Sequence, residues 1–174
     1  HQELSTPETQ TLHGVQLWYA LPDATRFSDN HFEHYEPSPV PAGDGVTARV
    51  FIGSLAGSTS PVDTRTPELL GAELILAPGA VAHLEVSRDF EFAALAETGE
   101  IEVNGTTVAH RELGYVPPGS DTLSLSSVDG ARVILLGGVP FGEQIVMWWN
   151  FIGRNHDEVA DYRQRYQAEM GFEE

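Results

Sequence analysis

Short apolar segments, interrupted by glycine and proline, run along most of this chain. Within these segments apolar side chains alternate with polar ones or follow one another directly, and β-branched and aromatic residues are frequent, as a half-buried sheet surface favours. The Gly and Pro residues recur too often for helices of ordinary length. The pattern therefore predicts an all-β fold, with strands over 15–19, 46–52, 72–76, 90–95, 100–103, 122–125 and 132–136.

Two local signals predict a hairpin and a helix. Asn104-Gly105 lies between two strand-like segments, and both residue types accept the positive φ angles of a type I′ turn. Near the carboxyl end, apolar positions recur at steps of three and four residues, which is typical of a surface helix. We expect this helix over roughly 156–169, beginning after Asn155 and ending at Gly171.

A polar segment separates two β units. Residues 23–44 combine several prolines with Asp, Ser, Asn and His side chains and show little strand pattern. We expect this segment to be a connector between strands in 1–22 and a larger β unit over 45–154, which the helical segment 155–174 follows.

The composition excludes several kinds of chemistry. The 174 residues, about one domain's length, carry 9 basic residues, all Arg, against 26 acidic ones, a net charge of −17. Without Lys there is no Schiff base or Walker-type phosphate loop, and the charge argues against direct nucleic-acid binding. Without Cys, a metal must be held by His, carboxylate or water. No apolar stretch is long enough to span a membrane, and we expect a cytoplasmic protein.

The first residues offer two metal-binding side chains. In His1-Gln2-Glu3 an imidazole and a carboxylate are two positions apart, so that on a strand both point to one face. These donors suit one mononuclear divalent metal, such as Fe, Ni, Mn or Zn. Glu3 is also the candidate catalytic residue, as a ligand or as a base once displaced. Taken alone, this motif more often belongs to an exposed polar terminus.

Residues 77–125 follow the segment order of a cupin barrel, with a strand, a hairpin and a P-x-G turn. The neighbourhoods where metal-binding cupins carry their ligands offer His83, Glu85, Glu91, Phe92 and Thr122. His83 and Glu85 alternate to the same face of a strand, but without further ligands a solvated pair is the simpler interpretation. We therefore expect no transition metal inside this barrel.

An aromatic cluster precedes the helix. Met147, Trp148, Trp149 and Phe151 lie close together in sequence. Such a cluster serves either as a ligand platform or, more commonly, as a seam that attaches a helix to a sheet. The serines lack a nucleophile elbow, so a Ser-His-Asp hydrolase is not indicated.

Together these segments resemble the pirin family of bicupins, in its bacterial branch, over nearly the whole chain. The most specific matches are the strand His13-Gly14-Val15-Gln16-Leu17-Trp18 and the run Met147-Trp148-Trp149-Asn150-Phe151, and the resemblance also rests on 1–5, 60–67 and 135–143.

The resemblance implies two cupin (double-stranded β-helix) barrels. The N-terminal barrel would hold one metal, usually iron, through three His and one Glu, and the C-terminal barrel would hold none. His1 corresponds to the third His ligand and Glu3 to the Glu ligand, whereas the other two belong to an upstream motif that this sequence does not contain. Residues 1–22 then supply only the closing strands of an incomplete first barrel, while 45–154 form the C-terminal barrel.

Three functions follow from the resemblance. We expect quercetin 2,3-dioxygenase-type oxidation of a flavonol or a similar enediol, with a small aromatic substrate. The alternatives are a metal-dependent regulator that binds transcription factors and an inactive C-terminal fragment with half a metal site. In each case the apolar edge around Val15, Leu17 and Trp18 calls for a partner, either the missing N-terminal cupin segment or a second copy of the chain.

Overall fold

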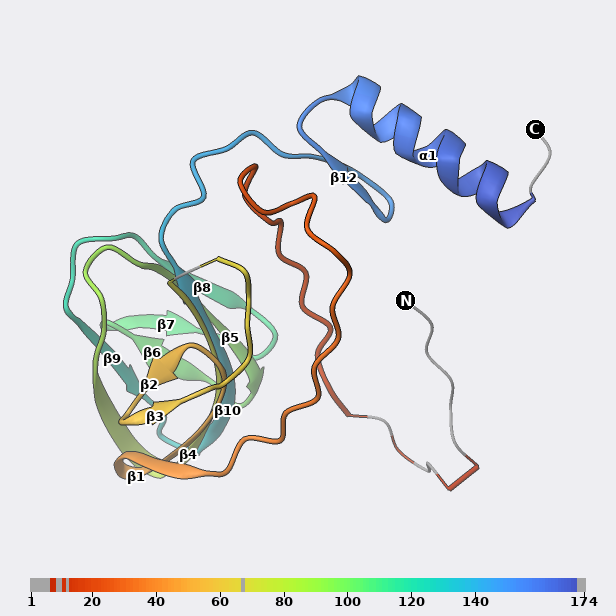
Figure 1. The fold of residues 1–174 in the computed structure, drawn as a ribbon. Coiled ribbons are helices and arrows are strands. Elements are labelled where there is room, and N and C mark those ends of the chain that lie inside the picture. Colours follow the sequence, from red (N-terminus) through yellow and green to blue (C-terminus); the bar gives the residue numbers. More distant parts are fainter. Residues whose placement is uncertain (1–6, 9–10, 12, 67, 172–174) are drawn as a thin grey trace. The chain divides into compact units, whose positions relative to one another are not determined.

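The computed structural model describes residues 7–8, 11, 13–66 and 68–171, which cluster into two compact units. One unit comprises residues 22–144, and the other combines 1–21 with 145–174. The elements, shown in Figure 1, are β1 (Val40–Ile52), β2 (Ser54–Leu55), β3 (Ser58–Thr59), β4 (Leu69–Glu85), β5 (Glu91–Thr98), β6 (Ile101–Val103), β7 (Thr106–Val108), β8 (Leu113–Val116), β9 (Thr122–Ser126), β10 (Ala131–Gly138), β11 (Val146–Trp148), β12 (Phe151–Gly153) and α1 (His156–Met170).

The unit of residues 22–144 is a nearly closed cupin-like barrel, which confirms the predicted fold class. Eight of its strands form one antiparallel sheet, in the order β7-β6-β9-β4-β10-β5-β8 with β1 also paired to β4, and β2 and β3 form a separate hairpin. β1 begins at Val40, before the expected barrel start at residue 45. The β11–β12 hairpin clusters with the helix-containing unit instead of with the barrel strands.

β4 takes part in both halves of the barrel. Residues 69–76 pair with β10 on one side and β1 on the other, whereas residues 81–85 pair with β9. Pro78 and Gly79 lie between the two stretches, and Gly79 has a φ of 76°, which favours glycine. Its N–H donates to the carbonyl oxygens of Ser127 and Val128 at 3.0 and 2.9 Å. The bend is therefore hydrogen-bonded to the loop that follows β9.

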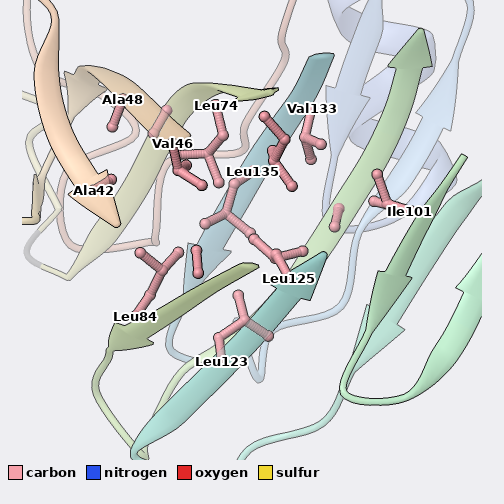
Figure 2. Packing of buried hydrophobic residues seen from close by; sticks show 14 of the residues in the cluster. Ala42, Val46, Ala48, Leu74, Leu84, Ile101, Leu123, Leu125, Val133 and Leu135 are labelled. Carbon is pink, nitrogen blue, oxygen red and sulfur yellow. The ribbon is translucent and has the colours of Figure 1, made fainter. Parts of the chain in front are cut away.

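Aliphatic side chains fill the barrel interior. Figure 2 shows Leu74, Leu125, Val133 and Leu135 pointing from β4, β9 and β10 into one shared space. All four are fully buried, and burial of each such side chain stabilises the fold by about 1.5–3 kcal/mol. The two-residue alternation of the sequence thus places one face of each strand in a common core.

The predicted hairpin at Asn104-Gly105 is confirmed. The two residues have φ angles of 48° and 78°, as a type I′ turn requires, and Ile101 pairs with Val108 across it. The Asn104 side chain also accepts a 2.9 Å hydrogen bond from the Ser124 N–H, which ties the turn to β9.

The predicted helix is confirmed as well. Asn155 accepts a 2.9 Å hydrogen bond from the Glu158 N–H, and Glu158 in turn accepts one from the Arg154 N–H at 2.8 Å. Gly171 ends the helix in the left-handed conformation with a φ of 71°. No helix in the described part of the chain is long and apolar enough to cross a membrane.

The strand expected over 15–19 is not formed. Among the described residues, 13–22 contain no strand, and Val15, Leu17 and Trp18 are exposed. A strand is stable only where a neighbouring strand pairs with its backbone. The described part of this unit contains only the short β11–β12 ladder, whose two strands pair with each other.

Two glycine substitutions should separate backbone strain from steric conflict. At Gly105 (φ 78°) a Cβ would meet nothing within 4 Å, so Gly105→Ala should cost only the strain of a positive φ, about 1 kcal/mol. At Gly53 (φ 70°) a Cβ would lie 1.9 Å from the Leu69 carbonyl oxygen. Gly53→Ala should therefore reduce the urea unfolding free energy considerably more. Equal losses would contradict this packing.

Asn155 should be required for the start of α1. Asn155→Ala should cost about 1 kcal/mol, because the Glu158 N–H loses its acceptor. Asn155→Ser, which keeps a capping oxygen, is the matched control and should remain near the wild-type value. Thermal unfolding followed by the far-ultraviolet helix signal measures the difference. Identical behaviour of the two variants would show that the cap does not stabilise the helix.

Candidate functional site

The predicted metal ligands His1 and Glu3 lie outside the described residues, so their geometry stays a prediction. Within the described residues, no group of three or more His, Asp or Glu side chains is placed to hold a metal ion. A metal centre built from these two residues would need ligands beyond those that the structure describes.

The barrel interior does not fit a metal. The positions of β4 and β9 that point inward are aliphatic, among them Leu84 and Leu123 (Figure 2). Ser60 and Ser127 are the buried polar residues of the described chain, and their hydroxyls donate to the backbone carbonyls of Phe51 and Glu100. The interior therefore lacks the imidazole and carboxylate donors that transition metals require.

His83 and Glu85 point away from this core. They alternate along β4 with the buried Ala82 and Leu84, and both are exposed. They line a recess of about 680 Å³ bounded by the amino end of β1, the β2–β3 hairpin and the carboxyl end of β4.

A smaller recess of about 440 Å³ adjoins the first, because Ser54 and Glu85 line both. It also includes Glu68 and the aromatic ring of Phe90. Sequence reasoning did not identify either recess. Their residues come from separate segments, and only the three-dimensional pairing of β1 with β4 brings these segments together.

Of the remaining positions considered for metal binding, the two polar ones, Glu91 and Thr122, have local roles. The Tyr115 hydroxyl donates to the Glu91 carboxylate at 2.8 Å, and this hydrogen bond raises the pKa of Tyr115. The Thr122 hydroxyl donates to the neighbouring Asp121 carboxylate at 3.4 Å. Glu91 and Thr122 are therefore satisfied by partners on the barrel surface.

His31 forms a further local contact. Its Nε2 lies 3.1 Å from a Glu33 carboxylate oxygen, and the other Glu33 oxygen accepts a hydrogen bond from the Asp63 N–H at 2.9 Å. The hydrogen bond from His31 is the main reason that the pKa of Glu33 lies below its ordinary value. These contacts tie the connector to the loop around residue 63.

The aromatic cluster attaches the β11–β12 hairpin to the helix, which is the more common of its two predicted roles. Phe151 stacks on Trp148 with a ring-centroid distance of 6.2 Å and meets Tyr166 of α1 edge-on at 5.8 Å. The Arg163 guanidinium lies 5.3 Å from the Trp148 ring centroid. Trp149, at the hairpin tip, remains 77 % exposed and has a φ of 50°.

Comparison with known sequences connects these features. Residues 71–172 match the Pirin C-terminal cupin domain. A Pseudomonas aeruginosa protein named "Putative quercetin 2,3-dioxygenase" is 41 % identical over 160 residues, covering 92 % of this chain and 50 % of the relative. A Caulobacter vibrioides pirin-like protein is 30 % identical, covering 89 % of this chain and 54 % of the relative. The chain thus spans about half the length of the curated relatives it matches.

Solved structures agree with this comparison. The 1.78 Å crystal structure of quercetin 2,3-dioxygenase from Acinetobacter baumannii superposes with a TM-score of 0.78 at 31 % identity, covering 86 % of this chain and 50 % of that one. A second quercetin 2,3-dioxygenase structure from the same organism gives 0.79 at 18 % identity, covering 85 % of this chain and 53 % of that one. From the domain match and the close bacterial relative together, the chain belongs to the pirin family.

Proposed function

We propose that this chain is part of a pirin-type dioxygenase that oxidises a flavonol or a similar enediol. The observation that carries the proposal is the 41 % identity, over 92 % of the chain, to a relative whose name includes quercetin 2,3-dioxygenase. The similarity to a solved quercetin 2,3-dioxygenase, at 31 % identity, supports the same reaction class.

In this proposal His1 and Glu3 are metal ligands. An imidazole and a carboxylate suit a mononuclear divalent metal, with iron as the expected ion and Ni, Mn or Zn as alternatives. Any of these metals would supply Lewis-acid chemistry when bound, and iron would supply redox chemistry as well. Glu3 has a second role: when it is not coordinating, its carboxylate accepts the proton of an enolic hydroxyl group of the substrate.

The C-terminal barrel has a supporting role in this reaction. Its interior is filled with aliphatic side chains, so the reaction belongs to the His1 and Glu3 end of the protein. The exposed apolar side chains Val15, Leu17 and Trp18 support a further part of the proposal. We expect the N-terminal cupin segment of the family, or a second copy of the chain, to cover them.

Metal content and quercetin turnover test the proposal. Alone, the 174-residue chain should bind Fe or Ni substoichiometrically and should not oxidise quercetin, because two ligands hold such a metal weakly. Mixed with the N-terminal cupin piece of a pirin, it should bind the metal stoichiometrically and oxidise quercetin. His1→Ala and Glu3→Ala should abolish the gain, whereas His83→Ala, a matched change of an exposed histidine, should leave it intact.

Two results would contradict parts of this proposal. Stoichiometric metal binding by the chain alone that survives His1→Ala and Glu3→Ala would show that the ligands are misassigned. Full metal binding by the mixture without turnover of quercetin or related flavonols would reject the dioxygenase and favour the metal-dependent regulator.

A further inference from the structure

The larger recess on the barrel has the size of a small-molecule site. Its volume of about 680 Å³ lies within the range of about 300–1,000 Å³ common for ligand pockets. The amino end of β1, the β2–β3 hairpin and the carboxyl end of β4 line it. All of these elements belong to the barrel unit, so the recess does not depend on the rest of the chain.

The polar groups of the recess include both donors and acceptors. The Ser54 and Thr59 hydroxyls lie 2.8 Å apart and share one hydrogen bond, which leaves one hydroxyl proton and several lone pairs for a ligand. A neutral His83 imidazole offers one donor and one acceptor, and the Glu85 carboxylate only accepts. Among the described residues, neither His83 nor Glu85 has a side-chain hydrogen-bond partner.

The apolar part of the lining is aliphatic. Leu55, Leu84 and Ala42 are almost fully buried, so the exposed apolar lining comes from Pro41 and Ala56. No Phe, Tyr or Trp ring lines this recess among the described residues. The lining therefore suits the C–H face of a saturated ring or chain better than a flat aromatic ligand.

The chemistry of the lining separates the ligand classes. The Glu85 carboxylate would repel an anion bound here. In the described chain no Arg lines the recess to offset this repulsion. An ammonium group supplies donors only and would leave the imidazole N–H and the spare hydroxyl proton without acceptors. A ligand with several hydroxyl groups both donates and accepts, and it can satisfy all of these groups together.

We propose that this recess binds a neutral, hydroxyl-rich small molecule, such as a sugar or polyol. Glu85 and His83 bind its hydroxyl groups, the Ser54 and Thr59 pair binds a further one, and Pro41 and Ala56 contact its C–H face. The adjoining recess, which shares Ser54 and Glu85, gives room for a second sugar unit against Phe90. The proposal is independent of the metal site and of the proposed dioxygenase activity.

Titrations of the 174-residue chain followed by two-dimensional amide NMR test this proposal. The probes are the methyl glycosides of glucose, galactose and mannose, together with myo-inositol and the disaccharides maltose and lactose. At least one probe should shift the amides of residues 42–43, 54–59 and 83–85 in a saturable way. A disaccharide that binds more tightly than its monomers would indicate a glycan chain as the source, and equal affinities would indicate a free sugar.

Isosteric variants define the contacts. Glu85→Gln should raise the dissociation constant of the binding sugar about tenfold, because a charged acceptor is lost. Thr59→Val, which keeps the side-chain shape, should weaken binding as well and serves as the second variant. Glu100→Gln removes the same charge from an exposed turn outside the recess and should leave the affinity unchanged.

Three results would overturn the proposal. One is the absence of localised shifts with every probe up to its solubility limit. Another is sugar binding that Glu85→Gln and Thr59→Val leave unchanged. The third is saturable binding of butylamine or acetate at these amides in place of the sugars, which would assign the recess to a charged ligand.

Discussion

One bent strand holds the barrel together. β4 pairs with β10 and most of β1 before its bend and with β9 after it, so three neighbouring strands depend on one chain segment. The bend needs Pro78, which donates no hydrogen bond, and Gly79, whose φ of 76° disfavours other residues. Because the buried Leu76 and the buried Ala80 are four positions apart, an even number, the inward-facing parity is preserved across the bend. The core therefore stays continuous between the two halves.

The same parity decides where chemistry can occur on this barrel. It turns Ala82 and Leu84 inward and His83 and Glu85 outward, so this imidazole and this carboxylate cannot reach the interior. A metal inside would require polar donors at several inward positions, and each unpaired buried donor costs about 1–3 kcal/mol. The aliphatic filling makes the fold stable and leaves the outer recess as the place for ligands.

The sequence was most informative where one local rule decides the structure. Asn104-Gly105 allows few turns other than type I′, and Asn155 and Gly171 satisfy the ends of a helix from nearby atoms, so all three predictions were confirmed. The alternation around Leu17 instead describes a strand that needs a neighbour, and no strand of the described chain pairs with it. The recess was also missed, because Ser54 and Glu85 meet only through long-range pairing, which no local pattern reports.

The two units of the chain differ in how far their own elements pair and pack with one another. The barrel pairs its own strands and buries its own core, so it can be understood from residues 22–144 alone. In its described residues the second unit has a short ladder, one helix and an aromatic seam, and it keeps Trp18, Met147 and Trp149 exposed. Apolar side chains gathered in this way lower the free energy when another surface covers them. Pirin relatives about twice as long contain enough additional chain to provide such a surface.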